Sequence, residues 1–108
     1  MNENLTLNDL AVPLRALRLL TVEFGHLAAP YVKVSPIYPE RLELTFHEDL
    51  SGFEAWREAL GITPAAVTYG EQSGGRTRVL TADVGYAGAV VHLTGFADVA
   101  AALVGGAA

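Results

Sequence analysis

The sequence predicts an α+β fold, an antiparallel sheet of about five strands with two helices packed on one face. Three observations predict it. The chain has 108 residues, the size of one domain, and 51% of them are hydrophobic, which suffices for a packed core. Two segments repeat apolar residues at helical spacing, and several others alternate apolar and polar residues as strands do. The predicted order is α-β-β-α-β-β-β, with room for a short C-terminal helix from Phe96 onward.

The segment from Asp9 to Ala29 predicts the first helix. Asp9 is suited to the N-cap, and Pro13 then falls in the first turn, where its missing N–H costs little. The helix has to end before Pro30, because a proline disfavours helical backbone in the preceding residue. At 100° per residue, one face carries Leu10, Leu14, Leu17, Leu20, Phe24, Leu27 and Ala28.

A second apolar strip lies on the opposite side of this helix. It consists of Val12, Leu19 and Val22, which lie among charged residues. Apolar residues on an exposed helix face are candidates for contact with a partner. We therefore expect this strip to take part in an interface.

The segment YVKVSPIYPERLELTFHE, residues 31–48, predicts a β-hairpin with one wet or partner-facing side. Apolar and polar residues alternate in both halves, and Pro36 and Pro39 belong to the connection, since neither can donate to a sheet. The polar side carries Lys33, Arg41, Glu43 and Thr45.

Tyr38 lies in that connection, next to Pro39. An exposed and rigidly held tyrosine is a common anchor at protein interfaces, so Tyr38 is a candidate contact residue. The alternative is that the ring of Tyr38 packs over its own hairpin.

The segment SGFEAWREALG predicts the second helix. Ser51 and Glu54 have the spacing of a capping box, and Gly61 lies where a C-terminal cap is expected. Three strands are predicted to follow, at 66–70, 76–84 and 89–94.

The glycine-rich stretch YGEQSGGRTRV, residues 69–79, admits two interpretations. A phosphate-binding loop needs a helix N-terminus after the glycines, and usually a lysine. Here a β-branched run follows, and Gly74-Gly75 is a favoured hairpin dipeptide. The sequence favours the hairpin.

Composition and charge exclude several functions. There is no cysteine, which excludes disulfides, thiolate metal sites and cysteine nucleophiles. The formal net charge is −5, unsuited to a nucleic-acid binder. The first residues lack the features of a signal peptide, and no apolar run approaches the roughly 20 residues that span a bilayer. We expect a cytoplasmic protein that binds neither nucleic acid nor membrane.

The polar residues contain no evident catalytic or metal-binding motif. His26, His47 and His92 lack metal-ligand spacing, and no serine stands in a nucleophile-elbow context. We assign no catalytic residue, no metal site and no cofactor. One alternative stays open, since His47 and His92 are both expected on the sheet face away from the helices, where folding would bring them into a ligand or acid–base site.

The runs VSPIYPERLELTF, FEAWREALGI, VTYGEQSGGRTRVL and VHLTGFAD resemble small proteins without an assigned biochemical role that are carried by actinobacterial genomes, phages and mobile elements. This resemblance covers residues 10–97 and implies no activity. Residues 50–104 are also similar in element order to double-stranded-RNA-binding domains. Those domains grip phosphates with lysines at the start of the last helix, where this chain has Asp98 and no lysine.

We therefore predict one domain over residues 9–104, with tails at 1–8 and 105–108. Its predicted function is a non-enzymatic protein–protein interaction or regulatory module that associates with itself, with another protein, or with both. The alternative is a small-molecule-binding or small catalytic domain with its site near His47 and His92.

Overall fold

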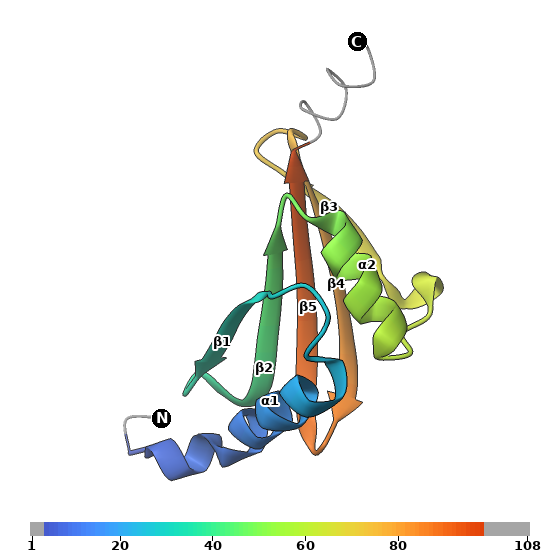
Figure 1. Cartoon of the computed structure of the whole chain (residues 1–108). Coiled ribbons are helices and arrows are strands. Elements are labelled where there is room, and N and C mark those ends of the chain that lie inside the picture. The colour runs from blue at the N-terminus through green and yellow to red at the C-terminus, as the bar shows by residue number, and fades with distance from the viewer. Residues whose placement is uncertain (1–3, 99–108) are drawn as a thin grey trace.

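The structure, a computed structural model, describes residues 4–98 and shows five strands and two α-helices (Figure 1). The elements are a 3-10 turn η1 (Leu7–Leu10), α1 (Ala11–Phe24), β1 (Tyr31–Ser35), β2 (Tyr38–His47), α2 (Leu50–Ala59), a 3-10 turn η2 (Pro64–Ala66), β3 (Thr68–Gln72), β4 (Thr77–Tyr86) and β5 (Ala89–Asp98). The α+β class agrees with the sequence prediction, and the order of elements differs from it slightly, because the 3-10 turns η1 and η2 precede α1 and β3.

The sheet is mixed, so the prediction of a purely antiparallel sheet was wrong. The strand order is β1-β2-β5-β4-β3, and the central strand β5 runs parallel to its neighbour β2. The other three pairs are antiparallel. The reason lies in the path of the chain, because α2 crosses the sheet after β2 and delivers the chain to the far edge. The meander β3-β4-β5 then returns to the centre, and β5 arrives beside β2 in the same direction.

Both helices cover the same face of the sheet, as predicted. The core between the two layers consists of Ala16, Leu20, Leu42, Leu44, Phe46, Phe53, Trp56, Ile62, Ala82, Ala89, Val91 and Leu93. A glycine in the central strand sets how closely α2 approaches. A Cβ on Gly95 would lie only 3.1 Å from a ring carbon of Phe53, so the absent side chain leaves room for that ring.

The first helix is shorter than predicted. α1 begins at Ala11 and ends at Phe24, whereas the sequence predicted Asp9 to Ala29. Asp9 belongs to η1, where its carboxylate accepts a hydrogen bond from the backbone N–H of Thr6 at 2.8 Å. Residues 25–30 leave the helix and pass over the core, where the backbone carbonyl of Ala28 accepts a hydrogen bond from Trp56 Nε1 at 2.8 Å.

The N-cap of α2 is Asp49, two residues before the predicted Ser51. Its Oδ1 accepts the backbone N–H of Gly52 at 3.0 Å, which satisfies one of the free donors of the first turn. Ser51 instead donates its hydroxyl to the same carboxylate at 3.0 Å. Both residue types cap helices well, so sequence alone favoured the one with a glutamate three positions on.

The glycine-rich stretch forms a hairpin turn, as predicted. Gly74 and Gly75 have positive φ angles of 67° and 86°, and the N–H of Gly75 bonds the carbonyl of Gln72 at 3.1 Å. The flanking strands β3 and β4 pair in antiparallel register. β5 continues to Asp98, so residues 96–98 are strand, and the rest of the predicted C-terminal helix lies outside the described residues.

Candidate functional site: the open face of the sheet

The helices leave one face of the sheet uncovered in the described part of the chain. The register of the strands shows which side chains lie on this open face. They are Thr45 and Thr94, the residues that pair with these two on neighbouring strands, and the residues that lie an even number of positions along a strand from any of these. They include Tyr31, Lys33, Arg41, Glu43, Thr45, His47, Thr68, Thr77, Val79, Thr81, Asp83, Val90, His92, Thr94, Phe96 and Asp98. Most of these residues are half-buried by their neighbours.

A row of threonines crosses the middle of the open face. Thr45 pairs with Thr94, Thr94 with Thr81, and Thr81 with Thr68, so one threonine from each of four adjacent strands lies in line. Tyr31 pairs with Thr45 and ends the row at the β1 edge. Threonine offers a methyl and a hydroxyl on a short stiff side chain, which makes this row flat and able to contact another sheet.

The next row carries charge. Lys33 pairs with Glu43, Glu43 with His92, and His92 with Asp83. His92 Nδ1 lies 2.6 Å from Asp83 Oδ1, and Glu43 lies 3.9 Å from the guanidinium of Arg41 on the same strand. From β1 to β4 the row therefore reads cation, anion, imidazole, anion. Its anions are half-buried to exposed, with side-chain exposures of 23% for Glu43 and 57% for Asp83.

Aromatic rings gather at the end of the face where β2 and β5 finish. The ring of His47 stacks on Phe96 with centroids 5.3 Å apart, and Tyr31 meets His47 edge-on at 5.0 Å. Phe96 also pairs laterally with Val79. This end of the open face is therefore apolar and ordered by ring packing.

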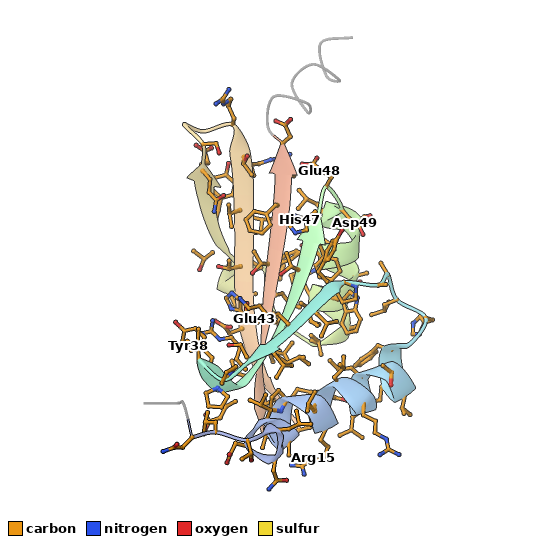
Figure 2. All side chains as sticks on the ribbon, turned by 90° about the vertical axis from the view of Figure 1, so that its left-hand side faces the viewer. Arg15, Tyr38, Glu43, His47, Glu48 and Asp49 are labelled. Carbon is orange, nitrogen blue, oxygen red and sulfur yellow. The ribbon has the colours of Figure 1, made fainter. Side chains whose placement is uncertain are left out.

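The opposite end of β2 carries Tyr38 (Figure 2). The ring of Tyr38 is 53% exposed, and the guanidinium of Arg41 lies 4.2 Å from its centroid, in cation–π contact. The two side chains border a shallow hollow of about 360 Å³ that also includes Val90. Tyr38 thus packs against Arg41 while keeping half of its surface exposed.

The structure does not bring His47 and His92 together, although both lie on the open face. His92 pairs with Glu43, whereas His47 lies four residues further along β2 and pairs with Phe96. Four residues of strand span about 13 Å, too far for a shared metal ion or a proton relay. Among the residues that the structure describes, no group of three metal-ligating side chains comes together.

The apolar strip predicted on α1, Val12, Leu19 and Val22, is only partly exposed to solvent. Val12 packs against the core, while Leu19 and Val22 are exposed at 41% and 77%. The helix is rotated from the predicted orientation, so that Pro13, Ala16 and Leu20 are buried and Leu14 is 39% exposed. The exposed large apolar residues of α1 are thus Leu14, Leu19 and Val22, which lie among Arg15 and Arg18.

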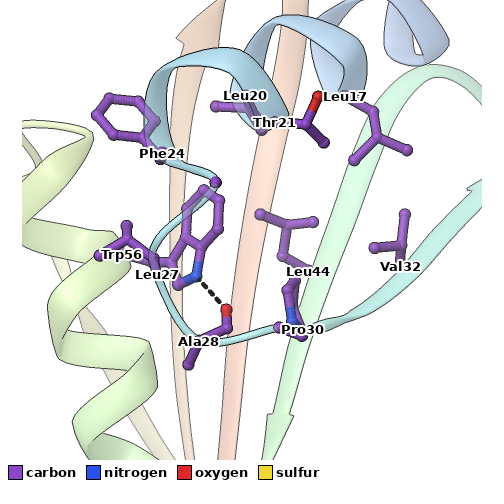
Figure 3. Close-up of a pocket in the computed structure, with 12 residues that line it drawn as sticks. Leu17, Leu20, Thr21, Phe24, Leu27, Ala28, Pro30, Val32, Leu44 and Trp56 are labelled. Atoms are coloured by element: carbon purple, nitrogen blue, oxygen red, sulfur yellow. Dashed lines mark hydrogen bonds between the residues drawn. The ribbon is translucent and has the colours of Figure 1, made fainter.

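An apolar pocket lies under the segment after α1 (Figure 3). Its volume is about 240 Å³, and its lining includes Phe24, Leu27, Val32, Leu44 and Trp56. The indole N–H already bonds Ala28, as Figure 3 shows, and the Thr21 hydroxyl donates to the carbonyl of Arg18 at 2.6 Å. The pocket thus presents almost no free polar group to orient a ligand, and it is smaller than the roughly 300–1,000 Å³ of typical ligand sites.

The lateral rows of the open face were not predicted from the sequence. Lys33, Arg41 and Glu43 were assigned to an interface because of strand alternation, and all three lie on the open face. Asp83 and Thr94 were not, because their neighbours across the sheet depend on the parallel pairing of β2 with β5. The alternation within β4 and β5 was visible in the sequence, but it says nothing about which strand lies alongside.

Comparisons with protein-family models, with curated proteins and with solved structures found no match to this chain. The resemblance to small actinobacterial and phage proteins therefore stays a prediction. No helix in the described range, residues 4–98, has the length and apolar character needed to cross a bilayer.

Proposed function

We propose that this protein is a non-enzymatic protein–protein interaction module and that the open face of its sheet is the binding surface. The observation that carries the proposal is the uncovered face of the parallel pair β2 and β5. Parallel strands are usually buried on both faces, whereas in the part of the chain that the structure describes these two are covered by helices on one face only. A second layer supplied by a partner would complete the arrangement.

The side chains of the open face support this assignment. Thr45, Thr94, Val79 and Phe96 are small or apolar, and long flexible cations are confined to its border at Lys33 and Arg41. Flat surfaces rich in small and aromatic groups resemble the core of protein interfaces, and long cations at the margin resemble their polar rim. We also propose that the protein functions in the cytoplasm.

A small-molecule-binding function is the second candidate, and its site would be the apolar pocket beside Trp56. That pocket is formed by residues far apart in the chain, as binding sites usually are. Its shortage of free hydrogen-bonding groups favours at most a small apolar ligand. The pocket does not involve His47 or His92, so the predicted histidine site gains no support from it.

Thr94→Arg tests the proposed function, with Leu19→Arg as its matched control on the helical side. Thr94 lies in the centre of the open face, where an arginine would project from a flat surface; Leu19 is exposed on α1. Sedimentation velocity would measure assembly, affinity capture with tagged protein would measure partner binding, and circular dichroism would verify folding. We expect Thr94→Arg to remove association while Leu19→Arg retains it. Undiminished association of a folded Thr94→Arg protein would contradict the proposal.

A further inference from the structure

We propose that the partner of the open face is a second copy of this chain, packed face to face about a two-fold axis that runs parallel to the strands between β2 and β5. The inference rests on the proposed function, since it names the occupant of the same surface. It follows from the order of charges in the row that Lys33, Glu43, His92 and Asp83 form across the sheet.

A two-fold axis in this position fixes which strands meet. It places β2 of one copy opposite β5 of the other and β1 opposite β4, while it preserves position along the strands. Each lateral row therefore faces the same row of the partner in reverse order. An interface of this kind is isologous, so every contact occurs twice.

The charged row is complementary to its own reverse. Lys33 of one copy faces Asp83 of the other, and Glu43 faces His92. Cations thus meet anions at the outer positions, and an anion meets an imidazole at the inner ones. Among the residues that the structure describes, Lys33 forms no ion pair, and Asp83 holds only the imidazole of His92. Lys33 and Asp83 can therefore each form an ion pair with a residue of the second copy.

A two-fold axis that crosses the strands along the charged row is unfavourable. An axis that crosses the strands along this row would place each charge opposite itself, with Lys33 on Lys33 and Glu43 on Glu43. Like charges held face to face oppose association. Of these two axes, the charged row favours the one parallel to the strands.

The neighbouring rows fit the selected axis. The threonine row places Thr45 opposite Thr94, two side chains of equal size that allow the sheets to approach evenly. At the aromatic end of the face, His47 of one copy falls opposite Phe96 of the other. This contact extends the stacking of His47 on Phe96 that is already present within one copy. Val90 falls opposite Arg41, at the hollow beside Tyr38. Aligned sheets of this kind pack with their strands about 30° apart.

The available area suits a dimer. The four strands that face one another offer about 475 Å² of projected surface on each copy, given strand spacings near 4.8 Å and rises near 3.3 Å per residue, because the five-residue strand β1 faces an equal length of β4. The accessible surface is larger because side chains are uneven. The total then exceeds the roughly 1,000 Å² that a specific interface requires.

Charge reversal at the outer pair provides the test. Lys33→Glu sets a new carboxylate against Asp83 twice in a homodimer, and Asp83→Lys sets two ammonium groups together twice. Each variant alone should dissociate about tenfold more readily than the unmodified chain. An equimolar mixture of the two should form a heterodimer, because both contacts then join opposite charges. The rescue should weaken in high salt, since exposed ion pairs are screened.

Sedimentation velocity at low ionic strength, with native mass spectrometry to identify the heterodimer, distinguishes the outcomes. Rescue on mixing supports the two-fold arrangement. A dimer that Thr94→Arg disrupts but that mixing does not rescue would overturn the arrangement and leave the proposed function standing. A chain that is monomeric at about 100 µM, far above the dissociation constants of specific complexes, overturns the second copy as partner. Association that Thr94→Arg leaves unchanged would overturn the proposed function itself.

Discussion

Lys33 and Asp83 lie at opposite ends of one row across the sheet, with Glu43 and His92 between them. The two residues are 50 positions apart in the sequence, and the parallel pairing of β2 with β5 places them in line. The row exists because a crossing helix separates the hairpin β1-β2 from the meander β3-β4-β5. The same connection that makes the sheet mixed therefore also creates the charge pattern of its open face.

Gly95→Ala should destabilise the fold, whereas Gly85→Ala should not. A Cβ at Gly95 would lie 3.1 Å from Phe53 and 3.2 Å from Leu50, while a Cβ at Gly85 would meet nothing within 4 Å. Overpacking of a core usually costs about 1–3 kcal/mol. Urea unfolding of the two variants measures the difference. Equal stabilities would show that α2 does not rest on Gly95.

Asp49→Ala should lower the free energy of unfolding by about 1 kcal/mol, because the N-cap of α2 loses its acceptor for the N–H of Gly52. Ser51→Ala is the control, since the Ser51 hydroxyl bonds only the side chain of Asp49. Its effect should be smaller. If thermal or urea unfolding showed a larger loss of stability for Ser51→Ala than for Asp49→Ala, Ser51 would be the N-cap, as the sequence predicted.

Trp56→Phe should destabilise the protein by about 1–3 kcal/mol, through loss of the bond to the Ala28 carbonyl and of buried volume. That bond ties α2 to the segment after α1. Tyr69→Phe removes a hydrogen bond of similar length, 2.7 Å to Glu71, at an exposed site, and should have little effect. If the two variants unfolded at the same urea concentration, the link between Trp56 and Ala28 would contribute nothing measurable.

Tyr86 should make stability fall in strong alkali. Its hydroxyl donates to Glu23, and this hydrogen bond, with burial and the negative charge of Glu23, raises the pKa of Tyr86 to about 12. Because the folded pKa lies above the ordinary value of 10.0, the contribution is complete below pH 10 and is lost as the pH rises toward 12.

Urea unfolding between about pH 9 and pH 12 tests this expectation. The unmodified chain should lose stability more steeply over that range than Tyr86→Phe, which has no proton to release. Identical slopes for the two proteins would contradict the contact between β4 and α1 that Tyr86 and Glu23 provide.

Local pattern was sufficient for much of the fold. The strands that contain Leu42 and Val91 alternate clearly, and the glycine pair at 74–75 sits between two such runs. The end of α1 was missed because residues 25–29 are as apolar as a helix face, yet the segment is held by Trp56, which lies 28 residues away from Ala28. Helical periodicity carries no information about such a distant hydrogen bond.

The sequence predicted that Lys33, Glu43 and His92 lie on the open face, but not which residues are their neighbours across the sheet. Alternation around Lys33 and Glu43 placed one edge of the open face correctly, because it depends on neighbours in the same hairpin. Their relation to His92 and Asp83 depends on strand order, which topology decides and residue pattern does not. For the same reason the sequence suggested a meeting of His47 with His92 that the register of β2 and β5 prevents.

Thiol labelling shows directly whether the open face binds a second copy of the chain. The chain contains no cysteine, so Val90→Cys and Leu19→Cys each introduce a single probe. The two native side chains are equally exposed, at 41%, but Val90 lies on the open face and Leu19 on α1. If the open face forms the dimer interface, maleimide labelling at position 90 should slow as protein concentration rises, while labelling at position 19 should stay constant. Equal labelling rates at both positions across all concentrations would contradict it.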